Sequence, residues 1–154
     1  MTRVAKERGA ATLAELPCAC ATARKMARGL TQLYDSRLRG AGIEAPQFIL
    51  LMTLGKLGSG SETELGRHLG LDKTTVSRNL RLLERYGWIV SSIGLDRRKR
   101  QFELTPAGRE RLALALPEWK KAQDQLRDAL APEDWAALFR ISRLVANVAQ
   151  GLNS

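Results

Sequence analysis

The sequence predicts a mainly helical fold that carries one small β-hairpin. Apolar residues recur at steps of three and four along most of the 154 residues, which is the period of an amphipathic helix. After Gly87 the period changes to two, which is typical of strands, and Gly or Pro residues separate the segments. A composition of 44% hydrophobic and 27% charged residues indicates one ordinary globular domain.

The N-terminal part predicts a long helix after a short flexible segment. Residues 1–15 are polar and rich in Ala, and we expect them to be flexible. Pro17 fits the first turn of a helix, because its missing N–H costs nothing there. Apolar residues recur from there to Leu38, and the Gly-Ala-Gly run at 40–42 ends the helix.

The next part of the chain predicts two shorter helices. Pro46 opens the first of them, which runs over 47–57 before a Gly-Ser-Gly run stops it. Ser61 and Glu64 have the spacing of a capping box, in which each side chain accepts a hydrogen bond from the other residue's backbone. We therefore expect a second short helix over 62–69.

A further helix begins after Asp72, which is a good N-cap residue, and ends near Tyr86. Val76, Leu80 and Leu83 share one face of this helix, so they are predicted to lie in the core. The opposite face is polar and basic.

The period-two segment predicts a hairpin. Residues 88–93 and 101–104 have the pattern of two strands, and the charged run 94–100 between them forms the turn. Two long helices are expected after it, and they begin at Pro106 and Pro132.

The order of elements predicts a winged helix-turn-helix over 46–105 within a single domain, 16–154. The flanking segments 16–45 and 106–154 are long helices with apolar stripes that would overhang a lone winged domain. We therefore expect them to be dimerisation helices that meet a second subunit.

The charge of the chain points to a polyanionic partner. The net charge is +9, and residues 73–100 carry eight basic against two acidic side chains. Hydroxyl and Arg side chains near the start of a helix suit the major groove of double-stranded DNA. The residues of this helix that we expect to bind DNA are Lys73, Thr74, Thr75, Ser77, Arg78 and Arg81.

The hairpin turn carries a second group of predicted DNA contacts. Arg97, Arg98 and Arg100 belong to a run of four cations, which repel one another unless a polyanion meets them. An Arg at a wing tip can enter the narrow minor groove. Asp96 lies two residues before Arg98 and is expected to brace it.

The same residues leave one alternative function open and argue against several others. A non-specific nucleoid-type DNA-binding protein would carry the same charge, so it remains the alternative. An enzyme is not expected, because the sequence has no phosphate-binding Gly-rich loop, zinc-protease motif or nucleophile elbow. We expect no cofactor, no metal site and no membrane partner, and two Cys without a disulfide scaffold favour the cytoplasm.

Four stretches of the chain carry recognisable motifs: Leu71 to Leu80 (LDKTTVSRNL), Leu83 to Ile89 (LERYGWI), Asp96-Arg97-Arg98, and Leu104 to Gly108 (LTPAG). Together they resemble the MarR family of bacterial transcription regulators. The resemblance implies a winged-helix homodimer, usually a repressor, which binds a pseudo-palindromic operator and is released when an effector binds or a Cys is oxidised. It implies that Arg98 is the wing-tip arginine and Asp96 its brace. Ser91 and Ser92 stand where many members have an Arg.

Cys20 is the candidate sensor residue. It lies in or next to the first turn of the predicted N-terminal helix, where the helix dipole favours thiolate, and Arg24 can add a positive charge. The resemblance to the organic-hydroperoxide-sensing branch of the family places Cys20 on the reactive Cys and Tyr34 on a Tyr that contacts it. Alternatively, Cys18 and Cys20 are small buried apolar residues or serve other thiol or metal chemistry. The other candidate effector is a small aromatic carboxylate, held near Tyr34 and Arg24.

Overall fold

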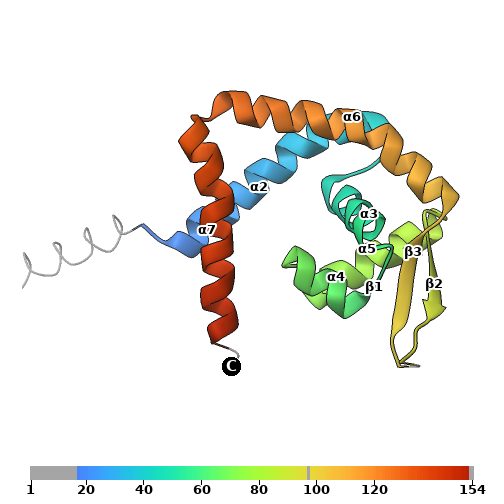
Figure 1. The fold of residues 1–154 in the computed structure, drawn as a ribbon. Coiled ribbons are helices and arrows are strands. Elements are labelled where there is room, and N and C mark those ends of the chain that lie inside the picture. Colours follow the sequence, from blue (N-terminus) through green and yellow to red (C-terminus); the bar gives the residue numbers. More distant parts are fainter. Residues whose placement is uncertain (1–16, 97, 153–154) are drawn as a thin grey trace, which may run out of the picture. The chain divides into compact units, whose positions relative to one another are not determined.

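The computed structural model describes residues 17–96 and 98–152, so the segment expected to be flexible, 1–15, lies outside the described residues. The chain divides into two units, Met1–Leu33 and Tyr34–Ser154. The elements are α2 (Ala19–Leu38), the 3-10 turn η1 (Arg39–Ala41), α3 (Ala45–Leu57), β1 (Ser59–Ser61), α4 (Glu62–Leu69), α5 (Lys73–Arg85), β2 (Ile89–Ile93), β3 (Arg100–Leu104), α6 (Pro106–Ala129) and α7 (Pro132–Gly151) (Figure 1).

Helices α3, α4 and α5 form the predicted helix-turn-helix, and their ends are set by caps. The capping box is present, because the Ser61 backbone N–H donates to Glu64 Oε2 at 2.8 Å and Ser61 Oγ accepts from the Glu64 N–H. Gly70 ends α4 in the left-handed region, with a φ of 64°. Asp72 then caps α5 by accepting from the Thr75 N–H at 2.9 Å. The predicted bounds of α4 are confirmed.

The sheet has three antiparallel strands in the order β1-β3-β2, one more than the predicted hairpin. The extra strand, β1, pairs with β3 so that Gly60 lies opposite Phe102. Its sequence is Ser-Gly-Ser, which has neither the alternation nor the β-branched residues that predict a strand. Gly60 is buried, and a Cβ there would lie 3.3 Å from Leu65. Close packing at this turn, rather than strand propensity, therefore forms the third strand.

The core lies where α3, α5 and α6 meet the sheet. Val76, Leu80 and Leu83 are at most 1% exposed, which confirms the predicted inner face of α5. Phe48 of α3 is fully buried and stacks on Trp119 of α6, with 6.0 Å between the ring centroids. The largest fully buried side chains are Leu38, Phe48, Leu50, Leu51, Leu54, Leu65, Val76, Leu80 and Leu83.

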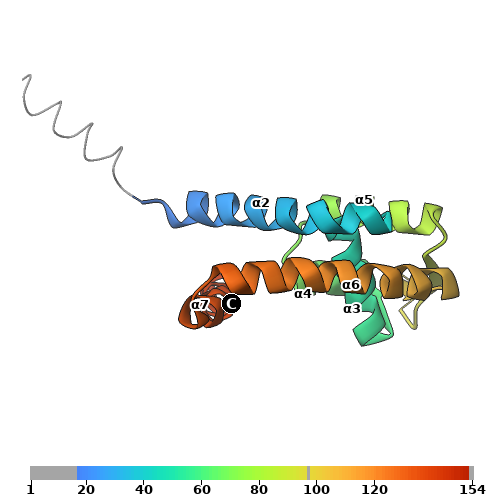
Figure 2. The same ribbon diagram turned by 90° about the horizontal axis from the view of Figure 1, so that it is seen from above.

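Helix α6 is one long helix, and the chain changes direction at its end before α7 begins (Figure 2). It is tied to the end of α2, because the Tyr34 hydroxyl donates to the Gln123 side chain and Arg37 donates to Gln125 at 3.0 Å. Helix α7 differs from the others in this unit, because none of its described residues is buried. Its apolar side chains are therefore not buried in a hydrophobic core formed by the described residues.

Candidate nucleic-acid interface

Helix α5 carries an open, basic surface on the side opposite its buried face. The surface is a shallow hollow whose lining contains four cations and two hydroxyls and no acidic residue. Cations can bind DNA phosphates there, and Arg or hydroxyl groups can reach base edges. The lining residues are Lys73, Thr74, Ser77, Arg78, Arg81 and Arg85.

Thr75 lies next to this hollow but is not among its lining residues. Its hydroxyl donates to Asp72 Oδ2 at 2.6 Å, and its backbone N–H donates to Asp72 Oδ1 at 2.9 Å. These bonds, the hydroxyl first, hold the pKa of Asp72 below its usual value of 3.8. Asp72 is therefore ionised near neutral pH, and Thr75 is engaged in the cap of α5.

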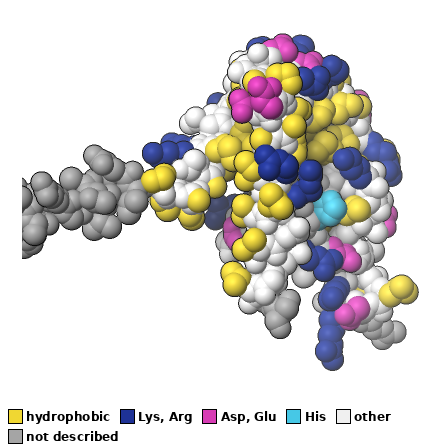
Figure 3. All heavy atoms as spheres, turned by 60° about the vertical axis from the view of Figure 1, so that its left-hand side comes forward, with side chains coloured by type: hydrophobic (Ala, Val, Ile, Leu, Met, Phe, Trp, Pro, Cys, Tyr) yellow, Lys and Arg dark blue, Asp and Glu magenta, His cyan; other side chains and the backbone are white. Residues whose placement is uncertain are grey.

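The wing, which consists of β2, β3 and the turn between them, carries exposed cations at this turn. The turn is closed by two backbone bonds, from Gly94 N to Lys99 O at 3.0 Å and from Lys99 N to Asp96 O at 2.8 Å. Arg98 and Lys99 are both exposed, and Figure 3 shows Lys and Arg side chains running down the wing at the lower right. Arg97 lies outside the described residues.

Asp96 contacts Arg98 in a different way from the expected one. Its Oδ1 accepts a hydrogen bond from the Arg98 backbone N–H at 3.0 Å. The sequence suggested a contact with the guanidinium instead. The observed bond orients the main chain of the turn, so the carboxylate can position Arg98 while its side chain remains exposed.

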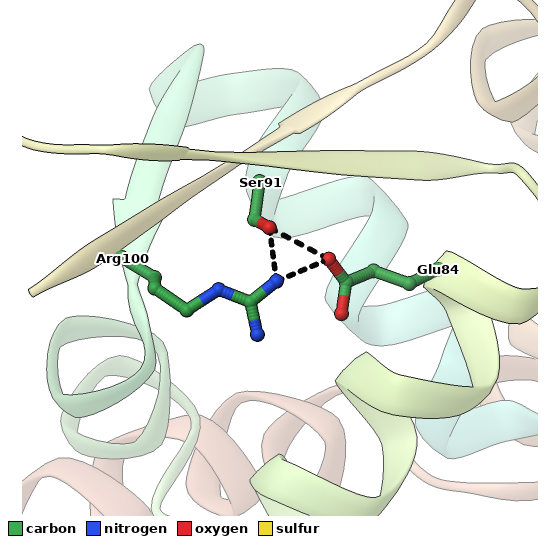
Figure 4. A network of polar contacts seen from close by, with 3 residues as sticks. All are labelled: Glu84, Ser91 and Arg100. Atoms are coloured by element: carbon green, nitrogen blue, oxygen red, sulfur yellow. Dashed lines mark hydrogen bonds and ion pairs between the residues drawn. The ribbon is translucent and has the colours of Figure 1, made fainter.

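Arg100 is the predicted wing contact that the structure ties most firmly to the protein. Its Nη2 lies 2.7 Å from Glu84 Oε1 and also donates to Ser91 Oγ (Figure 4). Ser91 Oγ donates to the same Glu84 oxygen at 2.7 Å. The guanidinium also lies over the Phe102 ring, 5.3 Å from its centroid. Arg100 therefore joins the wing to the last turn of α5.

Sequence reasoning missed Glu84 and Ser91 as members of this network. The sequence does contain a signal for Glu84, because a single acidic residue among the cations from Lys73 to Arg85 indicates an ion pair with a cation. Ser91 stands out in the sequence only because it lies where the family resemblance implies an Arg. Their pairing with Arg100 depends on the register of the sheet, which brings Ser91 opposite Phe102.

The candidate sensor residues lie in both units. Cys18 and Cys20 are free and exposed in the single chain, so the alternative in which they are small buried residues does not hold there. Cys20 and Arg24 lie on α2 in the N-terminal unit. Tyr34 belongs to the larger unit, where burial raises the pKa of its hydroxyl.

The described residues contain neither a metal-binding group nor a membrane-spanning helix. Within residues 17–96 and 98–152, no three His, Cys, Asp or Glu side chains form a group that could hold a metal ion. Over the same ranges, no helix has the length and apolar character needed to cross a membrane.

This fold and the basic surface of α5 define a winged helix-turn-helix protein. Known proteins share the arrangement: the MarR family matches residues 43–99. The transcriptional regulator MosR of M. tuberculosis, crystallised in complex with DNA, is 32% identical with a TM-score of 0.78, covering 88% of this chain and 98% of that chain. A second structure of MosR has a TM-score of 0.71 at 32% identity, covering 88% and 96%.

A curated relative points the same way. The uncharacterized HTH-type transcriptional regulator YwoH of Bacillus subtilis (strain 168) is 24% identical over 118 residues, covering 77% of this chain and 86% of that protein. Together with the identity to MosR over most of both chains, these findings show that the chain belongs to the MarR family of transcription regulators.

Proposed function

We propose that this protein is a sequence-specific DNA-binding transcription regulator that acts as a homodimer on a pseudo-palindromic operator. The observation that carries the proposal is the hollow on α5, which gathers four cations and two hydroxyls without an acidic neighbour in its lining. The similar protein MosR has been crystallised in complex with DNA. A non-specific nucleoid-type protein is the alternative.

The proposed binding mode uses two grooves. Helix α5 enters the major groove, where Arg78 and Arg81 reach base edges and Lys73 binds phosphate. The wing follows the backbone, and the exposed Arg98 enters the minor groove, where its charge is favoured by the narrow, electronegative floor. Arg97 is proposed as a further contact on the same turn.

The proposed homodimer accounts for the apolar face of α7. Ile141, Val145 and Val148 are 52%, 63% and 69% exposed in the single chain. Figure 3 shows hydrophobic side chains reaching the surface here. A second copy that covers this face would also place two α5 helices on one DNA, at half-sites about one helical turn apart.

We infer that the regulator is a cytoplasmic repressor released by one of two effectors. The first is oxidation at Cys20, which is supported by its exposure and by its place in the first turn of α2. The second is a small aromatic carboxylate, the other effector that the sequence suggests. Organic hydroperoxide that releases wild type from DNA but not Cys20→Ser would select the first.

The experiment is fluorescence anisotropy on an operator selected from random DNA. Arg78→Ala is expected to lose about 1–3 kcal/mol of discrimination at one base step. Arg98→Ala is expected to weaken binding most on operators with an A·T-rich minor groove. Lys120→Ala is the matched control, because this cation lies on α6 and pairs with Asp124 at 2.9 Å.

The outcomes separate the two functions. If the protein touches about eight phosphates, the logarithm of the binding constant falls against the logarithm of salt with a slope near −7. A specific regulator binds its operator at least about a thousandfold tighter than random DNA. A ratio near one would favour the nucleoid-type alternative, and Arg78→Ala that behaves like Lys120→Ala would contradict the role proposed for α5.

A further inference from the structure

Three elements meet at one carboxylate on the edge of the DNA-binding surface. Glu84 lies in the last turn of α5, Ser91 in the middle of β2 and Arg100 at the start of β3 (Figure 4). The Glu84 side chain is 25% exposed, and its Oε1 takes both the Ser91 hydroxyl and the Arg100 guanidinium. One oxygen atom thus connects α5 with both strands of the wing, β2 and β3.

Glu84 has a physical need for this partner. A negative side chain in the last turn of a helix is disfavoured by the helix dipole, whose negative end lies there. The guanidinium at 2.7 Å supplies the opposite charge, and its stacking over Phe102 fixes its plane. Arg100 therefore compensates a charge of the protein itself.

The other wing cations are placed differently. Arg98 and Lys99 are exposed, and among the described residues no ion pair involves either of them. They remain available for DNA phosphates. Arg100 is 59% exposed in its side chain but is held by an anion, a hydroxyl and an aromatic ring.

We propose that Glu84, Ser91 and Arg100 form a wing clamp that fixes the orientation of the wing relative to α5. Arg100 is then a positioning residue, not a phosphate contact, and Glu84 supports binding although its charge repels DNA. The proposal rests on the proposed DNA-binding function, because it explains how the helix and the wing reach one duplex together.

The first test compares salt dependence with affinity on the selected operator. Arg98→Gln, the matched control, is expected to lower the salt slope by about 1.8, since each of the two subunits loses one phosphate or groove contact worth about 0.9. Arg100→Gln is expected to weaken specific binding about tenfold, because a bond to a charged group is lost, without changing that slope. Glu84→Gln is expected to weaken specific binding as well, although it makes the protein more positive.

A double variant shows whether the two residues act as one unit. Glu84→Gln with Arg100→Gln is expected to bind no more weakly than Arg100→Gln alone, because either single change already opens the clamp. If Arg100 contacts phosphate instead, Arg100→Gln lowers the salt slope of the dimer by about 1.8, and Glu84→Gln strengthens binding. That result would overturn the proposal.

The second test needs no DNA. Hydrogen exchange of the backbone amides from Ser91 to Ile93 is measured in the free protein. Opening the clamp is expected to speed this exchange about fivefold in each single variant, as expected for loss of a partly exposed pair, and no further in the double variant. Arg98→Gln is expected to leave it unchanged.

The two tests fail separately. Wild type that binds no operator would overturn the proposed function, and the exchange measurement would still decide whether the clamp exists. Unchanged exchange in both Arg100→Gln and Glu84→Gln would overturn the clamp, whatever the DNA affinity.

Discussion

The winged helix, residues 45–108, and helix α7 both carry many apolar residues but place them in opposite ways. In the winged helix, Phe48, Leu65 and Leu80 are at most 1% exposed. In α7, no described residue is buried, and Val148 is 69% exposed. The difference teaches that the chain has two kinds of apolar packing. One is completed within the chain, and the other is completed, in our proposal, by a second copy.

The largest expected effect comes from disturbing the packing inside the winged helix. A Cβ on Gly108 would lie 1.9 Å from the Trp88 carbonyl oxygen, which accepts the Thr105 N–H. Gly108→Ala is expected to lower the free energy of unfolding by about 3 kcal/mol, because backbone must move to relieve the overlap. Denaturant unfolding followed by circular dichroism measures the change.

Gly40→Ala is the matched control for that substitution. Nothing lies within 4 Å of a Cβ built on Gly40, so its effect is expected to stay within about 0.5 kcal/mol. Equal stabilities for Gly108→Ala and wild type would contradict the close approach between α6 and Trp88.

The second prediction addresses the open apolar face. Val148→Asp is expected to raise the dissociation constant of the homodimer about 100-fold, because a charge replaces apolar surface twice in a two-fold interface. Asn147→Asp adds the same charge to an exposed neighbour outside the apolar stripe and is expected to change it little. Sedimentation of a dilution series measures both. A wild-type protein that stays monomeric at every concentration would contradict the proposal that a second copy covers the apolar face of α7.

The smallest expected effect concerns the cap of α4. Hydrogen bonds from the backbone N–H and the hydroxyl of Ser61, in that order, hold the pKa of Glu64 below its usual 4.5. The folded state therefore favours the ionised carboxylate, so this stabilisation is complete above pH 4.5. It is lost as the pH falls through the lower folded value.

Substitution of the cap tests that linkage. Glu64→Gln is expected to lower Tm by a few degrees at pH 7, with a difference from wild type that shrinks below pH 4.5. Glu110→Gln, at an exposed glutamate of α6, is the control. A Tm difference that is constant from pH 7 to pH 3 would contradict the account of the cap.

Much of the fold follows from local signals in the sequence. The helix-turn-helix is predicted well because its ends depend on short motifs, such as the Ser61–Glu64 box and the Asp72 cap. The inner face of α5 follows from helical spacing. The strand β1 could not be predicted, because its formation depends on pairing with β3, whose partner residues lie 40 to 44 positions further along the chain.

The candidate site was only partly accessible to the same reasoning. The hollow of α5 follows from one helix, so its cations and hydroxyls could be named in advance. The roles of Arg100, Glu84 and Ser91 depend on contacts between three elements, and charge alone grouped Arg100 with the exposed wing cations. The exposure of Cys18 and Cys20 was likewise not encoded in their spacing.

The most direct test of the central claim is hydroxyl-radical footprinting of wild type on the selected operator. The account predicts two protected tracts related by the pseudo-palindrome and about 10 base pairs apart between centres, with further protection where the wings meet the flanking minor grooves. Uniform protection along the whole duplex, or none at concentrations that saturate anisotropy, would contradict a dimer that reads two half-sites.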